Sequence, residues 1–275
     1  HAHKVRDSNL IIIFISIMGK ELKLVEDFDF DMIVDFFGRL NRQGPGSEQT
    51  TCQALNLVGK LPQDAKVADL GCGSGGQTLT LATHTDGTIR GMDISPKLID
   101  LFNARMKRHG YDDRVTGIVG SMAELPFEGE ELDLIWAEGS IYNIGFRRGL
   151  NEWRKFLKTG GAIAVSEVSW LTPTRPEEIN HFWHFHYAEI DTIPNKVKQM
   201  EDAGYTPQAH FIVPEDCWLD HFYKPMQACV TSFLEQYDYS ETARQFAQNQ
   251  LEEQNYYRKY KKYYGYVFYI GIKNE

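Results

Sequence analysis

Apolar residues follow two alternating spacings through the middle of this chain. Short apolar runs, typical of buried strands, alternate with stretches in which apolar residues recur every three or four positions, the spacing of one helix face. Two helices are expected to begin at Ser47 and at Ser95-Pro96, where the residue types favour helix starts. The alternation predicts a mainly parallel sheet with helices on both faces. Strands are expected at residues 66–69, 88–93, 114–119, 133–136, 162–167, 207–213 and 266–272.

Segments outside this alternating core are helical or aromatic. An apolar stripe over residues 28–40 predicts a helix. Residues 169–193 are crowded with Trp and His, and residues 214–264 are helical, with a capping box expected at Asp238 and Glu241. Insertions after strands form substrate pockets in open α/β sheets. We therefore expect the aromatic segment to cover a pocket.

The first strand ends in a glycine-rich turn that precedes a helix. Its sequence is VADLGCGSGG over residues 67–76, with Gly71, Gly73 and Gly75 in the turn. Glycine lets the backbone approach a ligand closely, and the start of the following helix presents unpaired N–H groups to it. Asp93 ends the next strand, where nucleotide-binding α/β folds hold a ribose. The pattern predicts a site for an adenosine-containing cofactor.

Asp69 bears on which cofactor binds. Gly71, Gly73 and Gly76 also fit the G-x-G-x-x-G pattern of dinucleotide-binding dehydrogenases. A carboxylate two residues before the first glycine would repel a pyrophosphate. S-adenosylmethionine carries an ammonium and a sulfonium group and no phosphate. We therefore expect S-adenosylmethionine, with NAD(P) as the alternative.

These residues and several later segments resemble the class I S-adenosylmethionine-dependent methyltransferases. The similarity covers residues 67–167 and includes LKTGG at 157–161, and it extends to the ubiquinone/menaquinone-biosynthesis-type subgroup through SMAELPF at 121–127 and LDLI at 132–135. It implies an α/β Rossmann-like fold with a mainly parallel seven-stranded sheet whose last strand is antiparallel. It also implies transfer of a methyl group to a small-molecule acceptor by in-line displacement. An NAD(P)-dependent oxidoreductase and a non-catalytic S-adenosylmethionine-binding protein are the alternatives.

The resemblance assigns roles to residues in and after the glycine loop. Asp93 is expected to bind both ribose hydroxyls, and Ile94 and Met122 to enclose the adenine. Ser121 stands where the family usually has Asp, so its hydroxyl or a backbone group must bind the adenine amino group. Glu138 is expected to hold the ammonium group of the cofactor or to orient a substrate. The expected cofactor-binding residues are Asp69, Gly71, Gly73, Gly75, Asp93, Ile94, Ser121, Met122, Ala123 and Glu138.

Residues near the mouth of the pocket are candidates for acceptor binding. Their aromatic content favours a flat or apolar acceptor. The histidines between residues 181 and 186 lack the spacing of known metal motifs, so no metal is expected. Methyl transfer mainly requires alignment of the reacting atoms, so no catalytic residue is assigned. The expected acceptor-binding residues are Tyr142, Asn143, Trp170, Trp183 and His184.

Composition narrows the choice of partners. The chain has 275 residues and a net charge of −9, with no dense Lys/Arg cluster before residues 258–262. Nucleic-acid surfaces need such a cluster, so a nucleic-acid partner is not expected. The four cysteines, at positions 52, 72, 217 and 229, show no C-x-x-C spacing. This favours reduced thiols and a cytoplasmic enzyme, and a homodimer is an open alternative.

The N-terminal segment contains an apolar run, residues 10–18, that is too short to span a membrane. We expect residues 1–27 to be a tag, a leader or a disordered segment, and residues 28–275 to form a methyltransferase domain. Within that domain we expect N-terminal helices over 28–60, a nucleotide-binding core over 61–168, a lid-like insertion over 169–193 and a C-terminal part with a helical insertion over 194–275.

Overall fold

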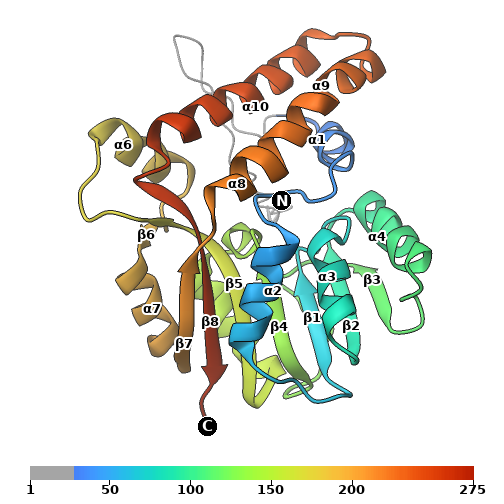
Figure 1. The fold of residues 1–275 in the computed structure, drawn as a ribbon, viewed down its shortest axis with the longest axis vertical. Helices are drawn as coiled ribbons and strands as arrows, with labels where there is room; N and C mark the ends of the chain where they lie inside the picture. Colours follow the sequence, from blue (N-terminus) through green and yellow to red (C-terminus); the bar gives the residue numbers. More distant parts are fainter. Residues whose placement is uncertain (1–27) are drawn as a thin grey trace, which may run out of the picture.

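The computed structural model describes residues 28–275, and the expectations for the leader segment and its apolar run lie outside the described residues. The centre is one mixed sheet with strand order β3-β2-β1-β4-β5-β8-β7 (Figure 1). Strand β8 is antiparallel to both of its neighbours, whereas the strand pairs from β3 to β5 are parallel. The predicted Rossmann-like sheet with an antiparallel last strand is confirmed. The strands are β1 (Lys66–Leu70), β2 (Thr88–Asp93), β3 (Val115–Val119), β4 (Leu132–Glu138), β5 (Leu157–Trp170), β6 (Asp191–Thr192), β7 (Tyr205–Ile212) and β8 (Tyr264–Lys273).

Helices cover both faces of the sheet. Successive residues of a strand face opposite sides, and Val67 and Ala68 of β1 accordingly belong to two different buried clusters. The first cluster includes Phe102 from α4, and the second includes Trp153 from α5. The flanking helices are α2 (Glu48–Val58), α3 (Gly76–His84), α4 (Pro96–Arg108), α5 (Phe146–Trp153) and α7 (Ile193–Asp202), with short 3₁₀ turns η2 (Ile141–Asn143) and η3 (Arg154–Phe156).

The remaining helices form a layer beyond the carboxyl ends of the parallel strands (Figure 1). We call this the cap layer. Its core is aromatic. The Phe36 ring packs edge-on against the Phe233 and Phe246 rings, with distances of 5.1 Å and 5.3 Å between ring centroids. The cap layer consists of α1 (Phe30–Phe37), α6 (Glu177–His186), α8 (Glu215–Trp218), a π-helical turn η4 (Leu219–Tyr223), α9 (Lys224–Gln236) and α10 (Glu241–Tyr260). Among the described residues, no helix is both long and apolar enough to cross a bilayer.

Two of the helix starts predicted from capping residues are formed in the structure. Ser47 accepts a hydrogen bond from the Thr50 backbone N–H at 3.1 Å, and Ser95 caps α4 in the same way. The capping box expected at Asp238 is wrong. Asp238 has a positive φ of 48° in the turn before α10, and Ser240 caps that helix instead.

Candidate functional site

The glycine loop after β1 turns sharply and lies against the loop that follows β4. Gly71, Gly73 and Gly75 have φ angles of +73°, +54° and +83°, which side chains rarely allow. A Cβ atom on Gly71 would come within 2.4 Å of the Ser140 side chain. Gly75 precedes α3, and a Cβ atom on it would come within 2.8 Å of the buried Phe102 ring. The loop therefore needs glycine for its turns and for this close approach.

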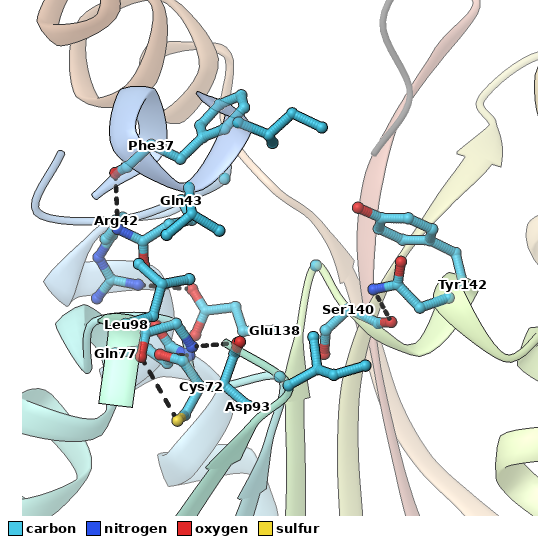
Figure 2. A pocket seen from close by; sticks show the side chains of 18 of the residues that line it. Phe37, Arg42, Gln43, Cys72, Gln77, Asp93, Leu98, Glu138, Ser140 and Tyr142 are labelled. Atoms are coloured by element: carbon cyan, nitrogen blue, oxygen red, sulfur yellow. Dashed lines mark hydrogen bonds and ion pairs between the residues drawn. The ribbon is translucent and has the colours of Figure 1, made fainter. Parts of the chain in front are cut away.

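A cavity opens above this loop, between the sheet and the cap layer. It holds about 820 Å³ of empty space, part of which is open to solvent. Figure 2 shows polar side chains from the glycine loop, β2, β4 and the segment after α1 gathered at one side, with Tyr142 standing apart from them. The lining comprises α1 (Phe30, Ile33, Val34, Phe37), the segment Arg42–Pro45, the loop residues Gly71, Cys72, Gly73 and Gln77, then Asp93, Ile94 and Leu98, and finally Glu138–Ser140, Tyr142 and Asn143.

Asp93 lies in the cavity lining, at the end of β2 as expected. Its Oδ2 accepts a hydrogen bond from the Gly73 N–H at 3.0 Å, and its Oδ1 accepts one from the Ser95 N–H at 2.9 Å. Burial raises the pKa of Asp93, and these backbone donors oppose the rise. Each carboxylate oxygen has more than one acceptor site, so both oxygens keep capacity for a ligand hydroxyl.

Asp69 does not line the cavity, and its expected role beside the cofactor stays a prediction. It is fully buried, and its Oδ2 accepts a hydrogen bond from the Thr78 hydroxyl at 2.5 Å. Side chains alternate along β1, so Asp69 shares a face with Val67 beneath α3. Burial raises its pKa to about 7, and the nearby charge of Glu138 adds to the rise. Asp69 thus fixes the start of α3 beneath the glycine loop.

Glu138 ends β4 and is the second carboxylate in the lining. Its Oε1 accepts a hydrogen bond from Arg42 Nη1 at 2.8 Å, and its side chain is only 4% exposed. Its Oε2 accepts hydrogen bonds from the Thr51 hydroxyl at 3.0 Å and from Trp136 Nε1 at 3.2 Å. The structure therefore holds Glu138 in one orientation at the cavity wall.

The segment after α1 contributes lining residues that sequence reasoning missed. Gln43 Oε1 accepts a hydrogen bond from the Ser74 N–H at 2.8 Å. Gln43 Nε2 donates to the backbone oxygens of Phe37 and Leu40 and to the Ser74 hydroxyl. One side chain thus connects the end of α1 to the glycine loop. The only sequence signal was the Gly-Pro-Gly break at residues 44–46, which marks a turn without naming its contacts.

The residues expected around the adenine are only partly brought together. Ile94 lines the cavity and is 42% exposed. Met122 lies outside the lining, although its Cε would approach a Cβ on Gly71 within 3.1 Å. Ser121 and Ala123 also lie outside it, and the Ser121 hydroxyl accepts a hydrogen bond from the Ala123 N–H. The expected contacts of Ser121 and Ala123 with the adenine stay predictions.

Of the expected acceptor-binding residues, only Tyr142 and Asn143 line the cavity. Trp170 belongs to β5, which is longer than predicted, and Arg175 packs over its ring. The Trp183 ring packs against the Tyr264 ring, with 4.9 Å between the ring centroids. The three residues Trp170, Trp183 and His184 all lie outside the lining of this cavity, so their expected role in acceptor binding stays a prediction.

Helix α1 contributes lining residues to the cavity, whereas no residue of the segment 169–193 lies in the lining. Tyr187 of that segment packs edge-on against Tyr142 at 6.1 Å, so it supports a lining residue without reaching the cavity. His184 is exposed and bonds to the Asn180 backbone oxygen. Within residues 28–275, no group of three or more metal-ligating side chains is assembled. The four cysteines are free thiols.

Comparison with known proteins agrees with this geometry. Residues 67–161 match the family model described as a methyltransferase domain. Over 123 residues the chain is 31% identical to 27-O-demethylrifamycin SV methyltransferase of Amycolatopsis mediterranei (strain S699), a match that covers 44% of this chain and 45% of that protein. Over 128 residues it is 30% identical to the ubiquinone/menaquinone biosynthesis C-methyltransferase UbiE of Geobacter sp. (strain M21), covering 46% and 53%. The chain thus spans about half the length of these curated relatives.

Similarity of fold extends over most of the chain. The crystal structure of a SAM-dependent methyltransferase from Geobacter sulfurreducens in complex with S-adenosyl-L-homocysteine superposes with a TM-score of 0.78 at 18% identity, covering 89% of this chain and 98% of that one. The matched region contains the glycine loop, Asp93 and Glu138. These findings confirm the predicted resemblance to the class I S-adenosylmethionine-dependent methyltransferases.

Proposed function

We propose that this chain, which carries a class I methyltransferase domain, transfers a methyl group from S-adenosylmethionine to a small-molecule acceptor. The observation that carries the proposal is that Gly71, Gly73 and Asp93 line one cavity. The domain match over residues 67–161 favours this donor over NAD(P). The relatives named above act on small molecules according to their names, which supports an acceptor of that class.

The side chains in the cavity suit the chemistry of this donor. Asp93 would hold the ribose hydroxyls, and Ile94 offers an apolar surface to the adenine. Glu138 supplies a carboxylate for the ammonium group. When bound, S-adenosylmethionine supplies an activated methyl group and a neutral thioether leaving group.

The protein contributes position and exclusion of water. Phe30, Ile33 and Phe37 of α1 form an apolar roof over the cavity, while Tyr142 lines another part of its wall. Orientation of two reactants can lower a barrier by about 7–11 kcal/mol. No acid or base is required for departure of the thioether, so the acceptor's own pKa decides whether one is needed.

Two measurements test this proposal. Calorimetric titration should show binding of S-adenosylhomocysteine and no comparable binding of NADH. Incubation of the chain with S-adenosylmethionine carrying a labelled methyl group, over a panel of small metabolites, should then transfer label to an acceptor. Preferred binding of NADH would overturn the donor assignment. Donor binding without transfer to any member of a broad panel would favour a non-catalytic binding protein.

A further inference from the structure

One face of α10 buries polar side chains inside the aromatic cap layer. Asn249, Gln250 and Glu253 are 2%, 2% and 9% exposed. Asn249 Nδ2, both amide atoms of Gln250 and Glu253 Oε2 have no hydrogen-bond partner among the described residues. Buried polar groups are almost always paired, because leaving them unpaired is unfavourable. These four atoms leave hydrogen-bonding capacity on one face of α10 that a polar ligand could use.

Glu253 is the only ionisable group among these three side chains. Its Oε1 accepts a hydrogen bond from the Tyr223 hydroxyl at 2.7 Å, which leaves Oε2 without a donor. Burial raises the pKa of Glu253 to about 8, and the bond from Tyr223 opposes the rise. In the described part of the chain, no Lys, Arg or His forms an ion pair with this carboxyl group. The ionised form of Glu253 therefore lacks a counter-charge, which a cation from outside the protein would supply.

Tyrosine residues lie near this carboxyl group, because burial and then its charge raise the pKa values of Tyr142, Tyr223, Tyr264 and Tyr266. Trp218 stacks on Tyr257 at 4.3 Å and contacts Tyr223 at 6.1 Å and Tyr266 at 4.8 Å. The faces of aromatic rings attract cations, Trp most strongly. A carboxylate with no cation of its own, placed among such rings, favours an ammonium group over a hydroxyl group or an anion.

The cluster is continuous with the cavity of the proposed donor site. Gly139 lines that cavity, and a Cβ atom on Gly139 would come within 3.1 Å of the Tyr266 ring. Tyr142 also lines the cavity, and its pKa is raised by burial, then by the charges of Glu167 and Glu253. Tyr142 lines the cavity and Tyr266 lies against its Gly139, and the charge of Glu253 acts on both tyrosines.

We propose that the acceptor is a small aromatic or apolar amine, and that Glu253 Oε2 binds its ammonium group while the rest of the molecule extends past Tyr142 toward the cavity. This inference rests on the proposed methyl transfer, and it names the acceptor class. Glu253 acts here as a binding residue, and the methylated atom lies at the other end of the molecule. Oε2 is closed to solvent in the structure, so the ligand enters by displacement of the Tyr142 or Tyr266 ring.

The test compares two probes of nearly equal shape, 2-phenylethylamine and 2-phenylethanol. Their dissociation constants are measured by NMR titration with the full chain saturated with S-adenosylhomocysteine. The amine should bind about 10- to 100-fold more tightly than the alcohol, the range typical of charge-assisted hydrogen bonds. Glu253→Gln should remove this preference. Glu235→Gln, the same change at an exposed position on α9, should leave it intact.

The pH dependence provides a second readout that does not need a variant. The amine should bind more tightly as the pH rises from 6 to 8, because Glu253 then loses its proton. The other titratable groups that face it are Tyr142, Tyr223, Tyr264 and Tyr266, whose pKa values are all raised, so they stay neutral over this range. Equal binding of amine and alcohol, or an amine preference that survives Glu253→Gln, overturns the inference.

Failure of the inference can be separated from failure of the proposed function. If the wild-type chain does not bind S-adenosylhomocysteine, the donor assignment fails. The amine and the alcohol are then compared in the absence of S-adenosylhomocysteine. If S-adenosylhomocysteine binds and the amine shows no preference, only the acceptor class fails. Unchanged affinity of the Glu253→Gln variant for S-adenosylhomocysteine shows that the variant is folded.

Discussion

The Arg42 guanidinium lies 2.8 Å from Glu138 Oε1, and this ion pair joins the segment after α1 to the end of β4. The two side chains are only 12% and 4% exposed. Arg42 Nη2 also donates to the Thr51 hydroxyl at 3.1 Å, so α2 takes part in the same network. One buried pair therefore connects the roof of the cavity to the sheet beneath it.

Removal of Arg42 should destabilise the protein because it leaves the Glu138 charge buried and unpaired. Breaking a buried ion pair costs about 3–5 kcal/mol, and Arg42→Ala should lower the free energy of unfolding in urea by an amount of this order. Arg42→Met combined with Glu138→Gln should recover part of the loss. The control, Lys198→Ala, removes an exposed pair with Asp202 and should change little. A loss for Arg42→Ala no larger than for the control would show that the pair is not structurally important.

Gln43 should control the mobility of the glycine loop. Gln43→Ala removes the acceptor of the Ser74 N–H and the donor to Phe37 and Leu40. We expect faster hydrogen exchange at the Ser74 amide and weaker binding of S-adenosylhomocysteine, since the loop must be reordered on binding. Gln208→Ala, which removes an exposed bond to the Leu57 backbone oxygen far along the chain, is the matched control. Exchange at Ser74 that is as slow in Gln43→Ala as in the control would contradict this role.

The sequence was most informative where structure depends on neighbouring residues. Strand β2 occupies Thr88–Asp93 as predicted, and Ser47 and Ser95 cap their helices. These features follow from apolar runs and from hydrogen bonds that span three residues. The position of Asp69 beneath α3 can also be predicted from the sequence, because strand alternation places its side chain on the same side as that of Val67.

Contacts between distant segments could not be predicted in this way. Arg42 and Glu138 are 96 residues apart, and Gln43 and Ser74 are 31 apart. Neither pair belongs to a periodic pattern, and both depend on how the cap layer is placed over the sheet. The environment of Trp183 could not be predicted either, because an aromatic residue in a helix can face a pocket or a core. In the structure Trp183 packs on Tyr264.

Asp69 should make the stability of the protein depend on pH. Its pKa is about 7 in the folded state and 3.8 in the unfolded reference, so the folded state retains its proton over a wider range. The stabilisation from this proton is complete below pH ~4 and is lost as the pH rises toward 7, by about 1.4 kcal/mol for each unit of pKa difference. The free energy of unfolding of the wild type should therefore fall relative to that of Asp69→Asn between pH 4 and 7. Parallel pH curves for the two proteins would contradict the raised pKa.

Asp93 should be the main side-chain determinant of donor affinity, because both of its oxygens are at the cavity and already oriented by the Gly73 and Ser95 backbones. Loss of charge-assisted hydrogen bonds to the ribose should weaken binding of S-adenosylhomocysteine by about 1–3 kcal/mol in Asp93→Ala, as measured by calorimetry. Asp100→Ala, an exposed position on α4, should have no effect. Part of the loss in Asp93→Ala comes from the freed Gly73 N–H, and Asp93→Asn separates the two contributions because the amide oxygen still accepts from one backbone N–H. If Asp93→Asn and Asp93→Ala both bind as tightly as the wild type, the ribose lies elsewhere in the cavity.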